Sequence, residues 1–305
     1  MSPGITVQCD QPTIRSAVQQ YLDEGRLHPP VPLTLEIEVG EVPPVPPDSA
    51  PPFHQPQLVF YPGTRPGSLT IVWETAPAQA RLENGSGRAR VILSPAAADR
   101  LPECQTGFLM MTVVFLLRRF GWHHVHGATA VDRRGRGWLM AGNSQVGKST
   151  TTAFLASRGW PVGTDDIAFL VPSAGRVAVH AFRSRIGLRP GGLELLAVSG
   201  GVFQPRRGKT VFWPEELGGT WVERIEPEVL LFPVIGGDRT TVTPLAPRDT
   251  LAQLVRWSAW VILEPQLAQE HLDLLAALGR QAPGYRLELG RDLFSNPQLI
   301  DELIP

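Results

Sequence analysis

The 305-residue sequence is poor in cysteine and has no long apolar run. Cys9 and Cys104 are the only thiols, too few for a disulfide scaffold or a four-thiolate zinc site. Two isolated thiols fit a reducing compartment, so we expect a cytoplasmic protein. The longest apolar stretch, between Gly107 and Leu117, is too short to cross a bilayer and predicts a buried helix. We therefore expect no membrane association.

Excess charge is also missing, because 28 basic residues stand against 29 acidic ones. Without a bulk positive charge, generic nucleic-acid binding is not expected. Lysine is nearly absent, since Lys148 and Lys209 are the only two among the basic residues. In a chain that uses arginine wherever either residue would serve, these two mark positions where a compact ammonium is needed. The hydrophobic fraction of 43% is enough for a sizeable core.

Composition divides the chain near residue 105. Residues 1–104 predict a smaller, mostly antiparallel α+β region with a proline-rich loop over 42–56. No chemistry is evident there, so by exclusion we expect this region to recognise the acceptor, that is, the molecule on which the rest of the chain acts. Its predicted elements are a helix over 13–25 and strands over 33–39, 57–61, 68–73 and 89–93.

Residues 105–305 predict a catalytic domain in which helices and strands alternate, so the fold class is α/β (α+β). A buried helix over 105–120 opens it. The predicted strands are 125–131, 137–141, 166–171, 177–181, 229–234, 240–242 and 285–289. The further predicted helices are 148–157, 247–259, 266–278 and 297–303.

A phosphate-binding loop lies between strand 137–141 and helix 148–157. It fits the pattern G-x-x-x-x-G-K-[ST]. The expected number of chance matches in a chain of this length and composition is only about 0.002. Glycines let backbone N–H groups surround a phosphate, the lysine reaches the terminal phosphates, and the hydroxyl can ligate Mg²⁺. We assign to the nucleotide the loop residues and the threonine after them: Gly142, Asn143, Ser144, Gln145, Val146, Gly147, Lys148, Ser149 and Thr150.

Two acidic residues, Asp165 and Asp166, precede strand 166–171. Adjacent carboxylates on an extended backbone point to different sides, so one can hold Mg²⁺ while the other accepts a proton from an acceptor hydroxyl. Which of the two is the base stays open. Upstream, His123, His124 and His126 form H-H-x-H without the further ligands of a zinc site. His126 opens the strand toward the loop and could lie near the phosphates, whereas the other two are expected to be structural.

The second lysine, Lys209, follows two arginines and a glycine. One interpretation places it on a γ-phosphate or an acceptor phosphate, with Arg183, Arg185 and Arg189 as further anion contacts. The alternative is an exposed, solvated basic turn.

In order and spacing, His126-Gly127, the loop 142–149, Arg158-Gly159 and Asp165-Asp166 resemble the HPr kinase/phosphorylase family. The likeness is specific over 121–171 and looser to about residue 305. It implies a P-loop in a mixed sheet, related to phosphoenolpyruvate carboxykinase, with ATP and Mg²⁺ as cofactors. It also implies roles for the individual residues: phosphate contact for Lys148, metal binding for Ser149 and Asp165, the base for Asp166 and assistance near the phosphates for His126.

Three features depart from that family. Its Glu-x-Arg-Gly-type stretch, used for reverse phosphorolysis, has no counterpart, although Glu194 lies nearby. The loop lacks a further glycine, and residues 1–104 are unlike the family's usual N-terminal domain. An acceptor other than HPr is therefore expected, as in a branch that looks like lasso-peptide kinases.

The sequence leads to one main hypothesis and two alternatives. The main one is an ATP-dependent kinase that phosphorylates a hydroxyl, expected to be serine, of a protein or peptide. The alternatives are a nucleotide-binding regulatory module with little activity and a small-molecule phosphotransferase. The sequence does not decide whether the protein forms a homo-oligomer.

Overall fold

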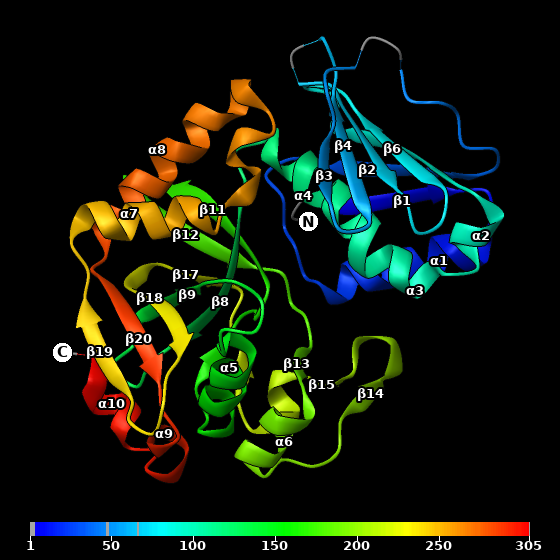
Figure 1. Ribbon diagram of the computed structural model, residues 1–305. Coiled ribbons are helices and arrows are strands. Elements are labelled where there is room, and N and C mark those ends of the chain that lie inside the picture. The colour runs from blue at the N-terminus through cyan, green and yellow to red at the C-terminus, as the bar shows by residue number, and fades with distance from the viewer. Residues whose placement is uncertain (1–3, 47–48, 66, 305) are drawn as a thin grey trace. The chain divides into compact units, whose positions relative to one another are not determined.

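A computed structural model describes residues 4–46, 49–65 and 67–304 (Figure 1). The chain is mixed α/β and forms two compact units. Unit 1 comprises Met1–His123 and Trp260–His271, and unit 2 comprises His124–Ala259 and Leu272–Pro305. This division differs from the predicted boundary at residue 104. The reason is that the apolar helical segment after that residue packs inside unit 1.

Unit 1 is a sheet with helices on it. The strand order is β1-β2-β7-β6-β5-β4-β3; β2 pairs in parallel with β1 and β7, and the remaining pairs are antiparallel. β1, β3 and β6 were not predicted, and β3 lies inside the predicted proline-rich loop over 42–56. The elements are β1 (Ile5–Cys9), α1 (Pro12–Glu24), β2 (Leu33–Val39), β3 (Phe53–Gln55), β4 (Leu58–Pro62), β5 (Leu69–Trp73), β6 (Ala78–Leu82), β7 (Arg88–Leu93), α2 (Pro95–Ala98), α3 (Leu101–Cys104) and α4 (Met110–Arg118).

The predicted helix over 105–120 is a π-helical turn, Gln105–Leu109, followed by α4. Aromatic contacts fix it to the sheet of unit 1. The Phe108 ring stacks 6.4 Å from Trp73 of β5, and the Phe115 ring lies 5.2 Å from Phe60 of β4. These rings belong to one buried core, so a boundary at residue 104 would cut through it.

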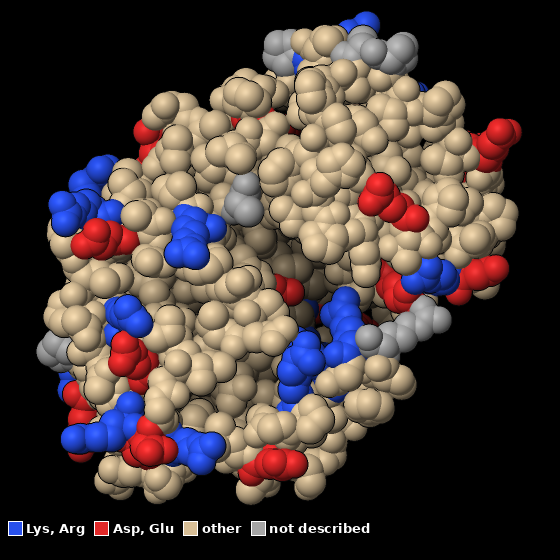
Figure 2. Space-filling view, viewed as in Figure 1, with Lys and Arg blue, Asp and Glu red and all other residues tan. Residues whose placement is uncertain are grey.

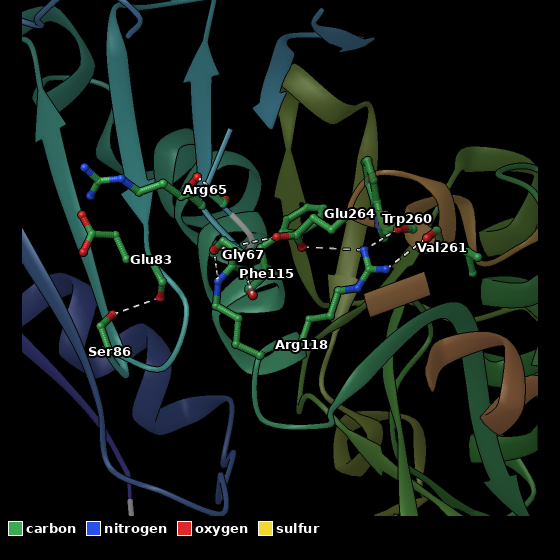
Figure 3. A network of polar contacts seen from close by, with 11 residues as sticks. Arg65, Gly67, Glu83, Ser86, Phe115, Arg118, Trp260, Val261 and Glu264 are labelled. Carbon is green, nitrogen blue, oxygen red and sulfur yellow. Dashed lines mark hydrogen bonds and ion pairs between the residues drawn. The ribbon is translucent and has the colours of Figure 1, made fainter. Parts of the chain in front are cut away.

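A buried ion network closes unit 1 around Glu264 (Figure 3). The Glu264 carboxylate accepts from Arg119 at 2.6 Å and lies 3.8 Å from Arg118. Both arginines also donate to backbone carbonyls: Arg119 to Gly67, and Arg118 to Trp260 and Val261. Since all three charged side chains are at most 2% exposed, the network ties the segment 260–271 to the end of α4.

Unit 2 contains a long mixed sheet in the order β17-β12-β11-β8-β9-β18-β20-β19, together with the smaller sheet β13-β15-β14. Its first elements are β8 (His123–Val131), β9 (Gly137–Ala141), α5 (Lys148–Ser157), β10 (Pro161–Val162), β11 (Ile167–Ser173), β12 (Arg176–Ala181), β13 (Ile186–Leu188), α6 (Pro190–Leu196), β14 (Val202–Gln204) and β15 (Lys209–Phe212). The later ones are β16 (Thr220–Trp221), β17 (Arg224–Ile225), β18 (Pro227–Ile235), β19 (Thr241–Pro244), α7 (Pro247–Arg256), α8 (Pro265–Gln281), β20 (Gly284–Leu289), α9 (Asp292–Ser295) and α10 (Leu299–Leu303). Residues 265–271 of α8 belong to unit 1.

The strands that carry the site are central in this sheet. Every residue of β9 is buried, which is typical of a strand covered on both faces. β9 pairs antiparallel with β8 and parallel with β18, so the sheet is mixed, as the resemblance implied. Buried side chains of α5, Ala153 to Ala156, pack in the same core as Trp138 and Met140 of β9. Across the described residues, none of the helices combines the length and apolar composition that a bilayer crossing needs.

Candidate functional site

The phosphate-loop sequence forms the turn between β9 and α5. The chain leaves β9 at Gly142 and enters α5 at Lys148, with Gly147 at φ 99°, ψ 0° as the cap before the helix. A Cβ on Gly147 would lie 2.5 Å from Leu289 Cδ1, so both the backbone conformation and the available space require glycine. The turn brings the N-terminal N–H groups of α5 to the loop, where the helix dipole favours an anion.

Lys148 points back into its own loop. Its ammonium donates to Gly142 O at 2.7 Å and to Asn143 O at 2.8 Å, and lies 2.9 Å from His126 Nε2. The side chain is buried, and this burial lowers the pKa of Lys148 to about 8, although the Asp166 and Asp165 charges act against the shift. The Lys148 ammonium is therefore held at the mouth of the loop by backbone carbonyls that a phosphate can replace.

His126 joins Lys148 to Asp166. His126 Nδ1 lies 2.8 Å from Asp166 Oδ1, and the backbone of β8 reaches β11 through a bond from Gly127 N to Asp166 O. Desolvation by surrounding protein raises the pKa of Asp166, but the hydrogen bond to His126 and the nearby His126, His124 and Lys148 charges outweigh it and hold the pKa at about 2. The Asp166 side chain is 57% exposed, so an ionised carboxylate faces outward from this chain of contacts.

Asp165 has different partners. Its carboxylate accepts from the Ser149 hydroxyl and, at 3.4 Å, from Gly187 N. The side chain is buried; burial and the Asp166 charge raise the pKa of Asp165, while these hydrogen bonds and Lys209 act against them. The two neighbouring carboxylates thus occupy separate environments, one against the loop and one toward solvent.

Ser149 and Asp165 fit a magnesium ion. A hydroxyl and a carboxylate are hard oxygen donors, and a P-loop metal takes such a pair together with phosphate oxygens and water. Among the residues that the structure describes, no group of three His, Cys, Asp or Glu side chains could hold a metal. A metal at Ser149 and Asp165 would therefore need the nucleotide to complete its six ligands.

Lys209 lies beside Asp165. It opens β15, and its stem crosses Gly187 of β13 so closely that a Cβ there would be 3.0 Å from Lys209 Cδ. Of the predicted anion contacts, Arg183 binds Glu215 at 3.0 Å and Arg185 lies over the Trp213 ring at 4.9 Å. Arg189 caps α6 and is exposed.

The remaining predicted residues lie on or beside the loop. Asn143, Ser144 and Gln145 form its exposed crest, with Asn143 Oδ1 accepting from Ser144 N at 2.8 Å. The Val146 side chain faces Gly142, since a Cβ there would lie 2.9 Å from Val146 Cγ2. Thr150, one residue into the helix beyond Ser149, faces α6, where a Cβ on Gly192 would lie 3.3 Å from its hydroxyl.

The other two histidines of H-H-x-H are buried and pack against residues outside the loop. His123 lies 3.4 Å from Glu270 and packs against the His271 ring within unit 1. His124 contacts the Phe169 ring, and burial lowers the pKa of His124 to about 3.

Three residues at the site were missed by sequence reasoning. The buried Thr164 hydroxyl accepts from the backbone N–H groups of Asp166 and Ile167 and so fixes the turn that separates the carboxylates. Gly187 donates to Asp165, and Trp213 supports Arg185. A threonine before an acidic pair is a signal that could have been used, whereas the other two depend on the pairing of β13 with β15.

Comparisons with known proteins add little to these contacts. No protein-family model matches the chain, and no curated protein does. Among solved structures, the HPr(Ser) kinase/phosphatase from Coxiella burnetii matches over 59% of this chain and 93% of its own, with 14% identity and a TM-score of 0.32. A likeness this loose carries no residue role or activity across. The case for function therefore depends on the side chains of the P-loop and the acidic pair.

Proposed function

We propose that this protein is an ATP- and Mg²⁺-dependent kinase that phosphorylates a hydroxyl group, serine in a protein or peptide. One observation carries the proposal. The two adjacent carboxylates face different surroundings: Asp165 accepts a hydrogen bond from Ser149 of the loop, whereas Asp166 contacts His126 and is exposed to solvent. Phosphoryl transfer needs this division, because it requires a metal beside the phosphates and a carboxylate beside the acceptor.

The loop supplies the phosphate contacts. Its backbone N–H groups and the start of α5 favour the anion, and Lys148 exchanges the carbonyls of Gly142 and Asn143 for phosphate oxygens. Ser149 and Asp165 would hold the metal, which neutralises charge on the transferring group when bound.

Asp166 positions the acceptor and receives its proton. As the acceptor oxygen bonds to the γ-phosphorus and the bond to the leaving ADP oxygen breaks, the hydroxyl proton passes to the Asp166 carboxylate. A carboxylate with a pKa near 2 is a weak base, so its larger contribution is to orient the hydroxyl. His126 holds that carboxylate in place through the 2.8 Å contact.

The test is γ-phosphoryl transfer from labelled ATP with Mg²⁺ to serine-bearing peptides and proteins, comparing the wild type with Lys148→Ala. Transfer should depend on Lys148 and be unaffected by Arg248→Gln, a matched surface change on α7. Binding of ATP without transfer to any acceptor would refute the kinase and leave the regulatory module. Labelling confined to free small hydroxy acids would make the protein a small-molecule phosphotransferase instead.

A further inference from the structure

The basic residues are concentrated beside the site. Between residues 183 and 209 the sequence has six basic residues and one acidic residue, in a chain whose net charge is −1. This stretch holds β13, α6, β14 and the start of β15, and basic side chains gather over β13 and β15 in Figure 2. An anionic partner is favoured at this place although the whole protein is nearly neutral.

One face of the small sheet β13-β15-β14 lies next to Asp165 of the candidate site. The antiparallel register sets Gly187 and Val202 opposite Val211, and Gln204 opposite Lys209, so these side chains share a face. Gly187 is the middle residue of β13, the edge strand of this sheet across from β14, and donates to Asp165. Because Gly187 has no side chain, Lys209 can lie across it next to the candidate metal ligand.

Arg185, two residues before Gly187, extends the same face. Its guanidinium lies over the Trp213 ring, which also supports Arg183 at 4.2 Å. Glu215 neutralises Arg183. Within the described part of the chain, no carboxylate forms an ion pair with Arg185 or Lys209. Two cations are therefore available to a ligand that approaches Asp166 along this face.

β14 forms the outer edge of this sheet. Among the strands of the described residues, β14 pairs with β15 alone. Its side chains are unusually exposed for apolar residues, at 52% for Val202 and 60% for Phe203. Such an edge offers backbone N–H and C=O groups to an added strand, and Val202 and Phe203 offer apolar contact on its two faces.

We propose that the face of β13, β15 and β14 is the acceptor-binding surface and that its ligand is an extended acidic peptide segment, paired along β14 with an apolar residue near the modified hydroxyl. The inference rests on the proposed kinase function. Charge decides between occupants, because a second copy would bring the same basic segment against itself. A nucleic acid would complement the positive charge, but it has no peptide backbone to pair with the edge strand β14.

The experiment measures binding of fluorescein-labelled serine peptides to the full-length protein without nucleotide. One peptide carries glutamates around a Leu-Ser-Val centre; two others replace every glutamate by glutamine or lysine. We expect the acidic peptide to bind about tenfold more tightly than the glutamine form, with affinity that falls as salt rises. The lysine form should not bind.

Matched variants locate the site. Arg185→Gln should weaken the acidic peptide about fivefold, and Arg185→Lys should restore only part of the loss, because lysine keeps the charge but not the planar stacking on Trp213. Arg248→Gln, at a side chain 88% exposed, should have no effect. Val202→Ser combined with Phe203→Ser should weaken all binding; the control Ile235→Ser changes a residue that is 70% exposed elsewhere. Unchanged ATP binding in each variant shows that the fold is intact.

Three results would overturn the inference. The first is equal affinity for the three peptides, or an Arg185→Gln variant with wild-type affinity. The second is tighter, Arg185-dependent binding of a labelled single-stranded oligonucleotide, which would make the surface a nucleic-acid site. The third is self-association that the double serine variant abolishes, which would assign the edge to a second copy. If ATP binds and the peptides do not, only this inference fails; if ATP does not bind, the proposed function fails.

Discussion

At the scale of single residues, Lys148 gives the site a dependence on pH. Burial lowers the pKa of Lys148 from 10.5 to about 8, so above that pH the free protein carries a neutral amine in its loop. Nucleotide phosphates favour the ammonium and should raise this pKa again. We therefore expect tight ATP binding at pH values below 8 and weaker binding as the pH rises above 8.

Proton uptake provides the measurement. Near pH 8.5, calorimetric titration with ATP in buffers of different ionisation enthalpy should show uptake of about three quarters of a proton per nucleotide bound, because about a quarter of Lys148 is already protonated there. Lys148→Arg keeps its charge throughout this range, so its uptake should be close to zero. Equal uptake by the two proteins would assign the proton to another group.

Asp166 separates catalysis from binding. Asp166→Asn retains an oxygen for His126 Nδ1 but cannot accept a proton. We expect turnover to fall by about 10²–10⁴-fold while the ATP dissociation constant changes little. Steady-state transfer assays with parallel equilibrium binding measure both quantities, and near-normal turnover would remove Asp166 from the role of base.

At the scale of elements, the loop depends on one glycine. Gly147→Ala imposes a side chain at φ 99° and a 2.5 Å approach to Leu289, whereas Gly175→Ala has a similar φ of 81° with nothing within 4 Å. Both variants should lose about 1–3 kcal/mol from backbone strain, as measured by urea denaturation. Only Gly147→Ala should also lose ATP binding, because only its side chain collides beside the loop. Equal ATP affinity in the two variants would show that the loop tolerates the collision.

The elements that were predicted are those with a strong local signal. The glycine-rich turn between β9 and α5, the apolar strands β8, β9 and β18 and the amphipathic α1 follow from residue pattern alone. β13 and β14 have three residues each, too few for a period to show, and β1 was overlooked at the start of the chain. Consequently Lys148, His126 and Asp166 could be proposed together, but the environment of Lys209 could not.

At the scale of the whole molecule, contacts between distant residues set the boundaries of the units. Arg118 and Arg119 interact with Glu264, which lies about 145 positions later in the chain. No local pattern marks such a pair. The predicted boundary at residue 104 therefore rested on a change of composition, whereas the structural boundary follows from packing.

Glu264 should dominate the stability of unit 1. Glu264→Gln leaves two buried guanidinium groups without their carboxylate, so we expect a loss of about 3–5 kcal/mol in the free energy of unfolding of unit 1. The exposed pair of Arg88 and Glu36 gives the control, because Glu36→Gln should cost no more than about 1 kcal/mol. Urea denaturation of both variants measures the difference, and similar losses would contradict a dominant buried network.

The split of unit 1 into Met1–His123 and Trp260–His271 also constrains the order of folding during synthesis. A ribosome releases Arg118 and Arg119 long before Glu264 exists, so unit 1 stays incomplete while the first segment of unit 2, His124–Ala259, is made. For the time needed to make about 145 residues, two arginines destined for the interior have no carboxylate and must stay hydrated. Unit 1 can close only after residues 124–259 of unit 2 and its own segment 260–271 have emerged, and a fragment ending at residue 123 should stay open however long it is given.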